Sequence, residues 1–288
     1  MMPSEDDARK RRKSFNVTRF EGDAFREVDD FVSTEEPLEI RVVFGPQGKR
    51  KDRSLSITMR TPGNDHELAA GFMVGEGIVS KPQQILKFEE TGPKVSGSEE
   101  SNQLCVHLAH DVDFDFGSLQ RNFYMTSSCG ICGTASLEAV KARMPNEDVA
   151  CSSIRVESSI IRSLPGTLRM AQETFEETGG LHAAGIFTKE GSLIACHEDV
   201  GRHNALDKLI GRRFLDGQLP DCKSIVLVSG RASFELVQKA ILAGIPILVA
   251  VGAPSSLAVE LAKEFRLTLV GFASANRFNI YSHAATIF

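Results

Sequence analysis

Residues 225–251 read IVLVSGRASFELVQKAILAGIPILVAV and contain two aliphatic runs separated by a helical pattern. The runs, at 225–229 and 247–251, are apolar at nearly every position, as expected for strands of a sheet covered by helices on both faces. Between them, apolar residues recur at the spacing of one helix face over 235–243. This stretch therefore predicts a three-layer α/β arrangement.

The alternation of strands and helices continues on both sides of this stretch. In the second half of the chain, the other predicted strands and helices are 183–188, 205–214, 257–265 and 267–271. In the first half, β-branched and alternating residues predict strands at 15–20, 38–44, 54–61 and 104–109, and helical patterns cover 65–74 and 135–143. Strands therefore predominate in the first half of the chain.

Polar segments indicate how the chain is divided. The segment 89–102 is rich in Gly and Ser and predicts an exposed loop, and 145–148 reads as a linker. We predict three parts, which are a disordered basic tail over 1–14, a strand-rich α+β lobe over 15–150 and an α/β lobe over 151–288.

Composition excludes several classes of function. With 288 residues, 42% of them apolar, and a formal charge of −5, the chain has no bias toward nucleic acid or a membrane surface. No apolar run approaches the roughly 20 residues that span a bilayer, and the N-terminus has no secretory segment. We therefore expect a cytoplasmic protein whose partners must be deduced from its sites.

Two thiols lie three positions apart in the segment TSSCGICGTAS, residues 126–136. The segment precedes a predicted helix, where free backbone N–H groups and the helix dipole favour the thiolate. Either Cys129 or Cys132 can then act as a nucleophile near neutral pH. The other cysteines (105, 151, 196 and 222) show no disulfide-scaffold spacing, and most lie in apolar runs that favour packed thiols.

Three functions fit such a pair besides an inert one. Structural zinc is disfavoured because the sequence has no second C-x-x-C. Dithiol redox chemistry stays open, although the pair lies mid-chain without the Trp that precedes it in thioredoxins. The third is sulfur transfer, in which a thiolate accepts a sulfane sulfur as a persulfide and passes it on. Gly130 and Gly133 give the loop the freedom that loading and delivery need.

Polar residues also gather in four loops that follow predicted strands, at 197–204, 229–233, 252–256 and 272–277. In open α/β sheets such loops meet at the carboxyl edge, where ligands bind. Gly, Ser and Arg at strand-to-helix turns hold phosphate groups, so these loops predict a nucleotide or pyrophosphate ligand. Simple turn chemistry is the alternative for each loop, because none matches a P-loop or a dinucleotide fingerprint.

We predict structural rather than catalytic roles for His182, His197 and His203. The spacing of His197, Glu198, Asp199 and His203 resembles no familiar two-His metal motif and predicts a hydrogen-bonded polar cluster. His182 begins an apolar strand and is predicted to be a satisfied structural histidine.

Several motifs taken together resemble the formate dehydrogenase accessory sulfurtransferase family. They are SCGICG at 128–133, GLHAA at 180–184, HEDVGRHNA at 197–205 and SGRAS at 229–233, with ELAAGF at 67–72 and the final stretch 271–281. The HEDVGRHNA string is specific, and the similarity runs from roughly residue 35 to the C-terminus.

The resemblance implies a homodimeric sulfur carrier with a cytidine-deaminase-like fold in 151–288. Such a carrier is loaded by a cysteine desulfurase and sulfurates the molybdenum (or tungsten) bis(molybdopterin guanine dinucleotide) cofactor, its bound substrate, for formate dehydrogenase. Cys129 would carry the persulfide, and Cys132 matches the second thiol of the motif. A carrier that binds and hands over the cofactor without covalent chemistry is the alternative.

The resemblance also implies where the cofactor binds. The last strand-end loop would contact the guanine dinucleotide through Phe272, Ala273, Ser274, Ala275, Asn276 and Arg277. The phosphate-holding loops would add Arg202, His203, Ser229, Gly230 and Arg231. The chain departs from the family at 274–276, where Arg-Asn-Gly is usual, so one charged contact and one glycine are missing.

Zinc is not expected from the deaminase relatives. Their metal is held by a His-x-Glu and a Pro-Cys-x-x-Cys motif. Here His182 is followed by Ala183-Ala184, and Ser128 precedes Cys129. Neither the metal nor deamination is therefore predicted from the fold.

Overall fold

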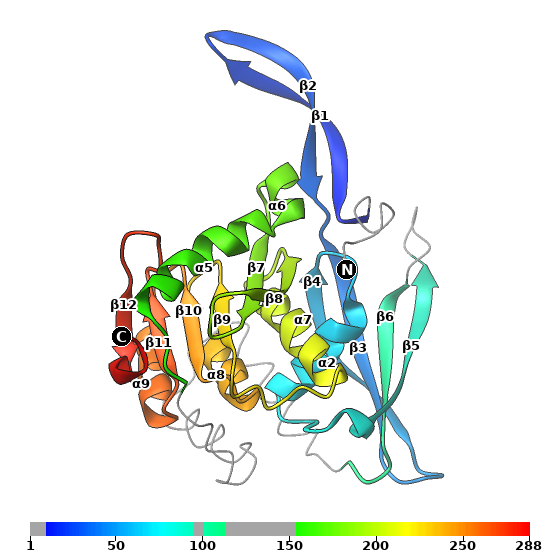
Figure 1. The fold of residues 1–288 in the computed structure, drawn as a ribbon. Helices are drawn as coiled ribbons and strands as arrows, with labels where there is room; N and C mark the ends of the chain where they lie inside the picture. Colours follow the sequence, from blue (N-terminus) through cyan, green and yellow to red (C-terminus); the bar gives the residue numbers. More distant parts are fainter. Residues whose placement is uncertain (1–9, 95–100, 113–153) are drawn as a thin grey trace.

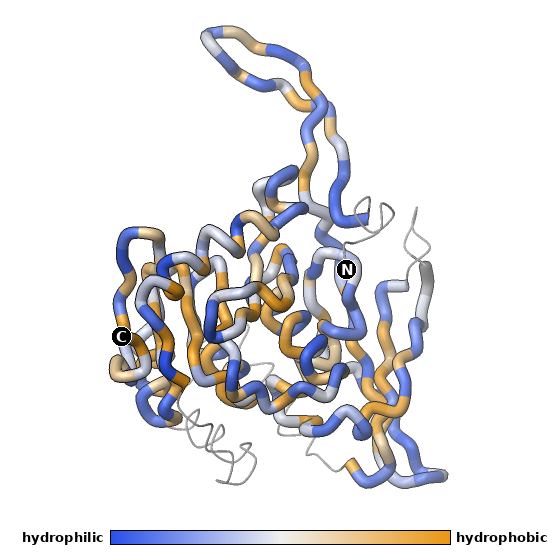
Figure 2. The backbone as a smooth tube through the Cα atoms, in the orientation of Figure 1, coloured by the Kyte–Doolittle hydropathy of each residue, from blue (hydrophilic) through white to orange (hydrophobic). Residues whose placement is uncertain are grey.

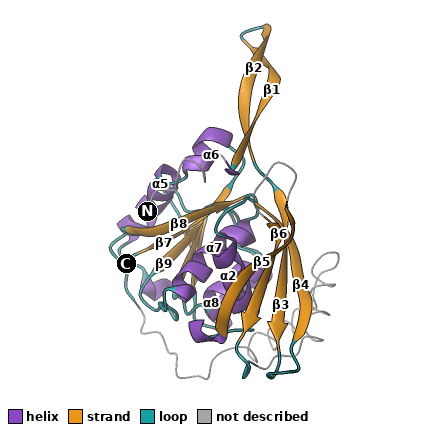
Figure 3. Ribbon diagram, turned by 90° about the vertical axis from the view of Figure 1, so that its right-hand side faces the viewer, coloured by secondary structure: helices purple, strands orange, loops and turns teal. Residues whose placement is uncertain are grey.

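The computed structural model describes residues 10–94, 101–112 and 154–288, and it shows two sheets separated by a layer of helices (Figures 1 and 3). The strands of the larger sheet are β7 (His182–Phe187), β8 (Leu193–Asp199), β9 (Ile225–Val228), β10 (Ile247–Ala250), β11 (Thr268–Gly271) and β12 (Asn279–Ser282). Their order is β12-β11-β10-β9-β7-β8. β9, β10 and β11 are parallel, whereas β7 runs antiparallel to β8 and β9.

Helices cover both faces of this sheet, as the sequence predicts. One face packs against α7 (Arg202–Leu215), α8 (Phe234–Leu242) and α9 (Ser256–Glu264). The other face packs against α5 (Ser158–Met170), which is followed by α6 (Glu173–Thr178). The central strands are coloured as hydrophobic in Figure 2, and every residue of β9 and β10 is buried. The three-layer α/β architecture is therefore confirmed.

The smaller sheet contains β3 (Glu36–Phe44), β4 (Lys51–Arg60), β5 (Ile85–Lys94) and β6 (Ser101–Leu108), in the order β4-β3-β6-β5. The exposed loop predicted over 89–102 is wrong for the end of β5 and the start of β6. These two strands pair antiparallel through residues such as Glu89 and Cys105. The reason is that β5 is an edge strand, and backbone pairing there tolerates polar side chains that face water.

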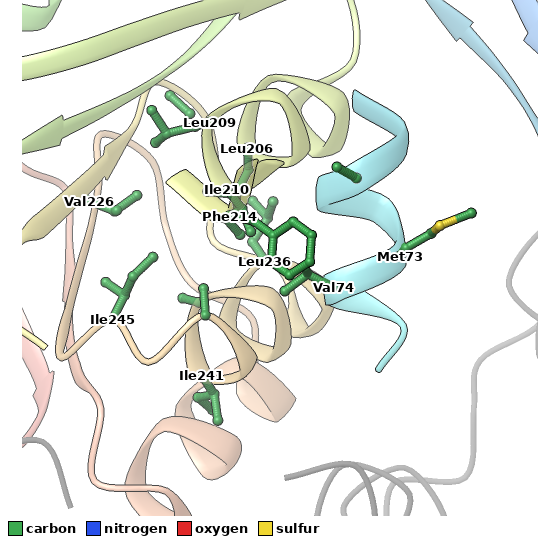
Figure 4. Packing of buried hydrophobic residues seen from close by; sticks show 14 of the residues in the cluster. Met73, Val74, Leu206, Leu209, Ile210, Phe214, Val226, Leu236, Ile241 and Ile245 are labelled. Atoms are coloured by element: carbon green, nitrogen blue, oxygen red, sulfur yellow. The ribbon is translucent and has the colours of Figure 1, made fainter. Parts of the chain in front are cut away.

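Helix α2 (Asp65–Gly75) lies between the two sheets and joins them into one core. A Cβ atom on Gly71 would lie 1.9 Å from the carbonyl oxygen of Asp207, and one on Gly211 would lie 1.8 Å from that of Glu67, so α2 and α7 touch backbone to backbone. Figure 4 shows Val74 of α2 beside Phe214 of α7. The domain boundary near 150 and the helix predicted over 135–143 lie outside the described residues.

A hairpin of β1 (Arg12–Glu21) and β2 (Ala24–Ser33) projects from the body, and we call it the arm (Figure 1). The disordered tail predicted over 1–14 is wrong for 12–14, which belong to β1, while 1–9 lie outside the described residues. Arg12 forms an ion pair with Glu177 and stacks 4.4 Å from the centre of the Phe31 ring, which fixes this end of the strand.

Two short 3-10 helices, η1 (Pro82–Gln84) and η2 (Ala284–Thr286), complete the elements. Across residues 10–94, 101–112 and 154–288, no helix combines the length and the apolar character needed to cross a membrane.

Candidate functional site

The strand-end loops of the larger sheet meet at one edge, as the sequence predicts. Because β9, β10 and β11 are parallel, the loops after them emerge together. Backbone hydrogen bonds then connect the loops: Gly252 N–H donates to the oxygen of Gly230 at 2.9 Å, and Phe272 N–H donates to the oxygen of Gly252 at 3.1 Å. The three loops therefore form one continuous surface.

The fourth loop is shorter than predicted. His197, Glu198 and Asp199 are the last residues of β8, and α7 already begins at Arg202. These polar residues can lie in a strand because backbone N–H groups donate hydrogen bonds to the carboxylates of Glu198 and Asp199. Since Asp199 pairs directly with His182 across the ladder, both residues still lie at the carboxyl edge of β9.

A cavity of about 540 Å³ opens at this edge. Its walls come from the end of α5, α6, the start of β7 and the ends of β9 and β10, and its lining residues are Pro165, Leu168, Arg169, Gln172, Phe175, Gly179, Gly180, Leu181, His182, Val200, Ser229 and Val251. Apolar walls with a few polar groups, in a volume of several hundred Å³, are typical of a small-molecule site.

The sequence prediction identified part of this cavity. Ser229 was predicted, whereas Arg169, Gln172 and Phe175 were missed because α5 and α6 were not predicted. His182 was predicted as a structural histidine but lines the cavity. Burial and the nearby Arg202 lower the pKa of His182, which favours the neutral imidazole.

Arg202 supplies an unused hydrogen-bond donor beside the cavity. Its Nε is buried and has no hydrogen-bond partner among the described residues. A Cβ atom on Gly230 would lie 3.7 Å from Cδ of Arg202 and 3.4 Å from Nδ1 of His182, which are ordinary van der Waals distances, so both side chains lie against this loop. A buried guanidinium donor without a partner is costly, and an anionic ligand oxygen would satisfy it.

Asp199 organises the turn before α7. Its buried carboxylate accepts hydrogen bonds from the N–H groups of Thr61 at 3.1 Å and Gly201 at 2.9 Å. Lys208 Nζ lies 2.8 Å from the same carboxylate and donates to the oxygen of Thr61 at 2.8 Å. Asp199 is hydrogen-bonded as predicted and ties the smaller sheet to the site, but the four predicted residues do not form one cluster, because Glu198 and His203 bond to other partners.

Glu198 positions the cavity wall. Its carboxylate accepts hydrogen bonds from the N–H groups of Thr174 at 3.0 Å and Phe175 at 2.8 Å, at the start of α6. Burial raises the pKa of Glu198, and these N–H groups oppose the rise. The ring of Phe175 is thereby held at the cavity, where the Arg169 guanidinium stacks 4.5 Å from its centre.

Of the remaining predicted site residues, His203 is hydrogen-bonded within the protein, whereas several others are exposed. His203 Nε2 lies 3.1 Å from Oγ of Ser233, and burial with the nearby Arg202 lowers the pKa of His203 to about 4. Arg231 is exposed, and so are Ala275, Asn276 and Arg277. No group of three or more His, Cys, Asp or Glu residues in the described chain is arranged to hold a metal ion.

The last loop contains an unusual backbone conformation. Phe272 has a φ of 52° and is 41% exposed, although a left-handed conformation is rare for a bulky residue. Ser274 Oγ donates to the oxygen of Arg277 at 3.0 Å and closes a tight turn. Ala273, between them, is buried in the core, so its side chain is not on the surface with its neighbours.

The thiol motif lies outside the described residues. Two other cysteines lie within them, and their pKa shifts show whether they could act as nucleophiles. Cys105 and Cys196 are free thiols. Burial raises the pKa of both, and that of Cys196 rises to about 12. These two are packed thiols, as predicted, and their raised pKa makes them poor nucleophiles.

These features define an α/β protein with a small-molecule cavity at a strand edge. The chain belongs to the FdhD/NarQ family, whose model matches residues 34–288.

Relatives and a solved structure are similar over nearly the whole chain. It is 49% identical to the sulfur carrier protein FdhD of Streptomyces avermitilis, covering 92% of each chain. It is 42% identical to the protein of the same name from Sulfurisphaera tokodaii, covering 95% of this chain and 97% of that one. The crystal structure of a formate dehydrogenase accessory protein from Desulfotalea psychrophila has the same fold, with a TM-score of 0.71, 24% identity and coverage of 96% and 99%.

Proposed function

We propose that this protein is a cytoplasmic sulfur carrier that takes sulfur from a cysteine desulfurase and delivers it to the molybdenum bis(molybdopterin guanine dinucleotide) cofactor of formate dehydrogenase. The membership of the FdhD/NarQ family supports this proposal, as do the names of its relatives. The observation that carries it is the presence, in one chain, of the Cys129-x-x-Cys132 motif and of a cavity whose lining residue His182 lies near Arg202, which has a buried Nε without a partner among the described residues.

In the loading step, the Cys129 thiolate attacks the outer sulfur of the desulfurase persulfide. The S–S bond of the donor breaks, its cysteine leaves as a thiolate, and a new S–S bond forms on Cys129. On delivery this bond breaks in turn. The outer sulfur becomes a sulfide ligand with two electrons from the reduced metal centre, and Cys129 returns to the thiolate.

The cavity fits one end of the cargo. A volume of about 540 Å³ accommodates one nucleotide, whereas the bis-cofactor carries two guanine dinucleotide ends. Phe175 offers a ring for the base, and Arg202 offers the unused donor to a phosphate. Two ends therefore require two cavities, which supports a homodimer.

A carrier that holds the cofactor without covalent chemistry is the second candidate. The cavity and Arg202 favour it as much as they favour sulfur transfer, because they explain binding only. A dithiol redox protein, in contrast, would have no need of the cavity.

Persulfide formation separates these candidates. The protein is incubated with a cysteine desulfurase and free cysteine, then measured by intact-mass and peptide mass spectrometry. We expect one extra sulfur on Cys129 or Cys132 that a reductant removes. An unmodified pair, with a desulfurase that is active in a control, would overturn sulfur transfer and favour the non-covalent carrier. A Cys129–Cys132 disulfide instead would favour redox chemistry.

Substitution of Arg202 tests the cargo site. Arg202→Ala is expected to weaken the binding of GDP at least tenfold in calorimetry, because one charge-assisted hydrogen bond to phosphate is worth about 1.5–3 kcal/mol. Lys189→Ala is the matched control: it removes the same charge from the turn between β7 and β8, at the opposite edge of the sheet. Equal binding by Arg202→Ala and the wild type would contradict the assignment.

A further inference from the structure

The arm has too few strands to be stable without contacts to something else. It is a two-stranded ribbon with ten residues per strand, which makes it about 33 Å long. Isolated two-stranded hairpins are marginally stable in water because neither face is covered. Large apolar side chains are nevertheless exposed on it, among them Phe15 at 51% and Val32 at 41%. In Figure 2 hydrophobic and hydrophilic colours alternate along the arm.

The register divides the arm into two faces. One, which we call the valine face, carries the cross-strand pairs Lys13/Val32, Phe15/Asp30, Val17/Val28, Arg19/Arg26 and Glu21/Ala24. The opposite face carries the pairs Arg12/Ser33, Ser14/Phe31, Asn16/Asp29, Thr18/Glu27 and Phe20/Phe25.

The opposite face satisfies its polar side chains, although it also carries the exposed rings of Phe20, Phe25 and Phe31. Thr18 Oγ1 donates to Glu27 at 2.6 Å, and the amide of Asn16 donates to Asp29 at 3.2 Å. At the tip, the Phe20 and Phe25 rings contact each other with centres 5.1 Å apart. This face needs no partner for its polar groups.

The valine face satisfies its charges only in part: Lys13 at its base pairs with Glu36 at 3.2 Å, but toward the tip the face carries a pair of like charges. Arg19 and Arg26 lie directly opposite each other, and like charges in such a pair are destabilising. Arg19 reaches Asp30 at 3.5 Å, while Arg26 has no ion pair or side-chain hydrogen bond in the described part of the chain. An acidic group from another molecule would stabilise the pair.

The order of charges on the valine face identifies that molecule. From base to tip, the pairs carry a positive charge, a negative charge, two valines, two positive charges and a negative charge. Reversing this order about the valines places Arg19 and Arg26 opposite Asp30, and Glu21 opposite Lys13. We infer that the valine face packs against the valine face of a second copy, with a two-fold axis at Val17 and Val28.

Such packing is geometrically ordinary. Two ribbons with the same right-handed twist can lie face to face at a small angle, about 10 Å apart. The contact is isologous, so every attractive charge pair occurs twice. The opposite face cannot pair in this manner, because Asp29 at its centre would meet the same residue of the second copy.

The charge balance of the arm disfavours other partners. It has four basic residues, Arg12, Lys13, Arg19 and Arg26, and five acidic residues, Glu21, Asp23, Glu27, Asp29 and Asp30. A surface with mixed charges does not attract nucleic acid or an anionic membrane. Positive and negative side chains alternate around an apolar centre on the valine face. A protein surface with the same alternation of charges is complementary to it.

The base of the arm is fixed to the cavity. Arg12 pairs with Glu177 of α6, and a Cβ atom on Gly180, which lines the cavity, would lie 2.4 Å from Oγ of Ser33. Pairing of the arms therefore fixes two cavities relative to each other. The inference rests on the proposed homodimer and names the surface that forms it.

Reciprocal charge reversal tests the pairing. Arg19→Glu/Arg26→Glu and Asp30→Arg each place like charges across the axis, and each is expected to raise the dimer dissociation constant at least tenfold in analytical ultracentrifugation. A mixture of the two variants restores both attractive contacts in a heterodimer, so the dimer should return. Thr18→Arg on the opposite face is the matched control and should stay dimeric.

Several outcomes would overturn the inference. They are a monomeric wild type, a charge-reversed variant that stays dimeric, a mixture that stays monomeric, or loss of the dimer in Thr18→Arg. The mixture also distinguishes charge repulsion from unfolding of the arms, because variants with unfolded arms would not form a dimer when mixed. Persulfide loading, measured on the same variants, reports separately on the sulfur chemistry.

Discussion

Replacing Cys129 by Ala is expected to reduce formate dehydrogenase activity to background in cells that depend on this protein. The substitution removes the thiolate that, in the proposal, accepts the sulfane sulfur. The fold should be unaffected, because a cysteine in a predicted loop contributes little to the core. The measurement is dehydrogenase activity in a complemented deletion strain, with the thermal unfolding of the purified variant.

Cys105→Ala is the matched control for Cys129→Ala. Burial raises the pKa of the Cys105 thiol, so this residue is a poor nucleophile and its loss should preserve activity. Normal activity in Cys129→Ala, and again in the double variant with Cys132→Ala, would exclude covalent sulfur transfer. The non-covalent carrier would then be the better description.

Replacing Gly211 by Ala is expected to destabilise the protein by about 3 kcal/mol or more. The added Cβ would lie 1.8 Å from the carbonyl oxygen of Glu67 and 2.7 Å from the backbone nitrogen of Gly71. Backbone atoms of a packed helix cannot move aside singly, so α2 and α7 would have to separate along their contact. The loss is a large share of the 5–15 kcal/mol that stabilises a typical protein.

Gly166→Ala provides the matched control within α5. A Cβ atom there meets nothing within 4 Å, so the alanine should stabilise the protein by about 0.4–1 kcal/mol. Both effects are read from the midpoint of urea unfolding at constant slope. An unchanged midpoint for Gly211→Ala would show that the two helices separate at little cost.

The sequence predicted the central strands because burial on both faces leaves an almost continuous aliphatic run. It did not predict α5, because Pro165 and Gly166 lie inside that helix. The buried residues Ile161, Leu164 and Leu168 nevertheless recur at helical spacing, and this signal was available. Strands β2 and β5 were missed because their apolar and polar residues do not alternate regularly, and backbone pairing alone does not show in a sequence.

The site was predictable to a similar extent. Loops after parallel strands must meet at one edge, so the positions of Ser229 and Gly230 followed from the strands. The cavity wall did not, because Arg169 and Phe175 come from helices that were not predicted. The unused donor of Arg202 depends on what surrounds it in three dimensions, and no spacing in the sequence reports that.

The backbone contact between α2 and α7 has a consequence for synthesis on the ribosome. The inner face of the smaller sheet, with Leu38 and Val106, shares its core with residues of α7, which lie about a hundred positions or more further along the chain. Contacts of such long sequence separation form late. The nascent N-terminal half must therefore expose the part of this apolar core that α7 covers until α7 has left the exit tunnel, and a chaperone that shields it during this interval would raise the yield of folded protein.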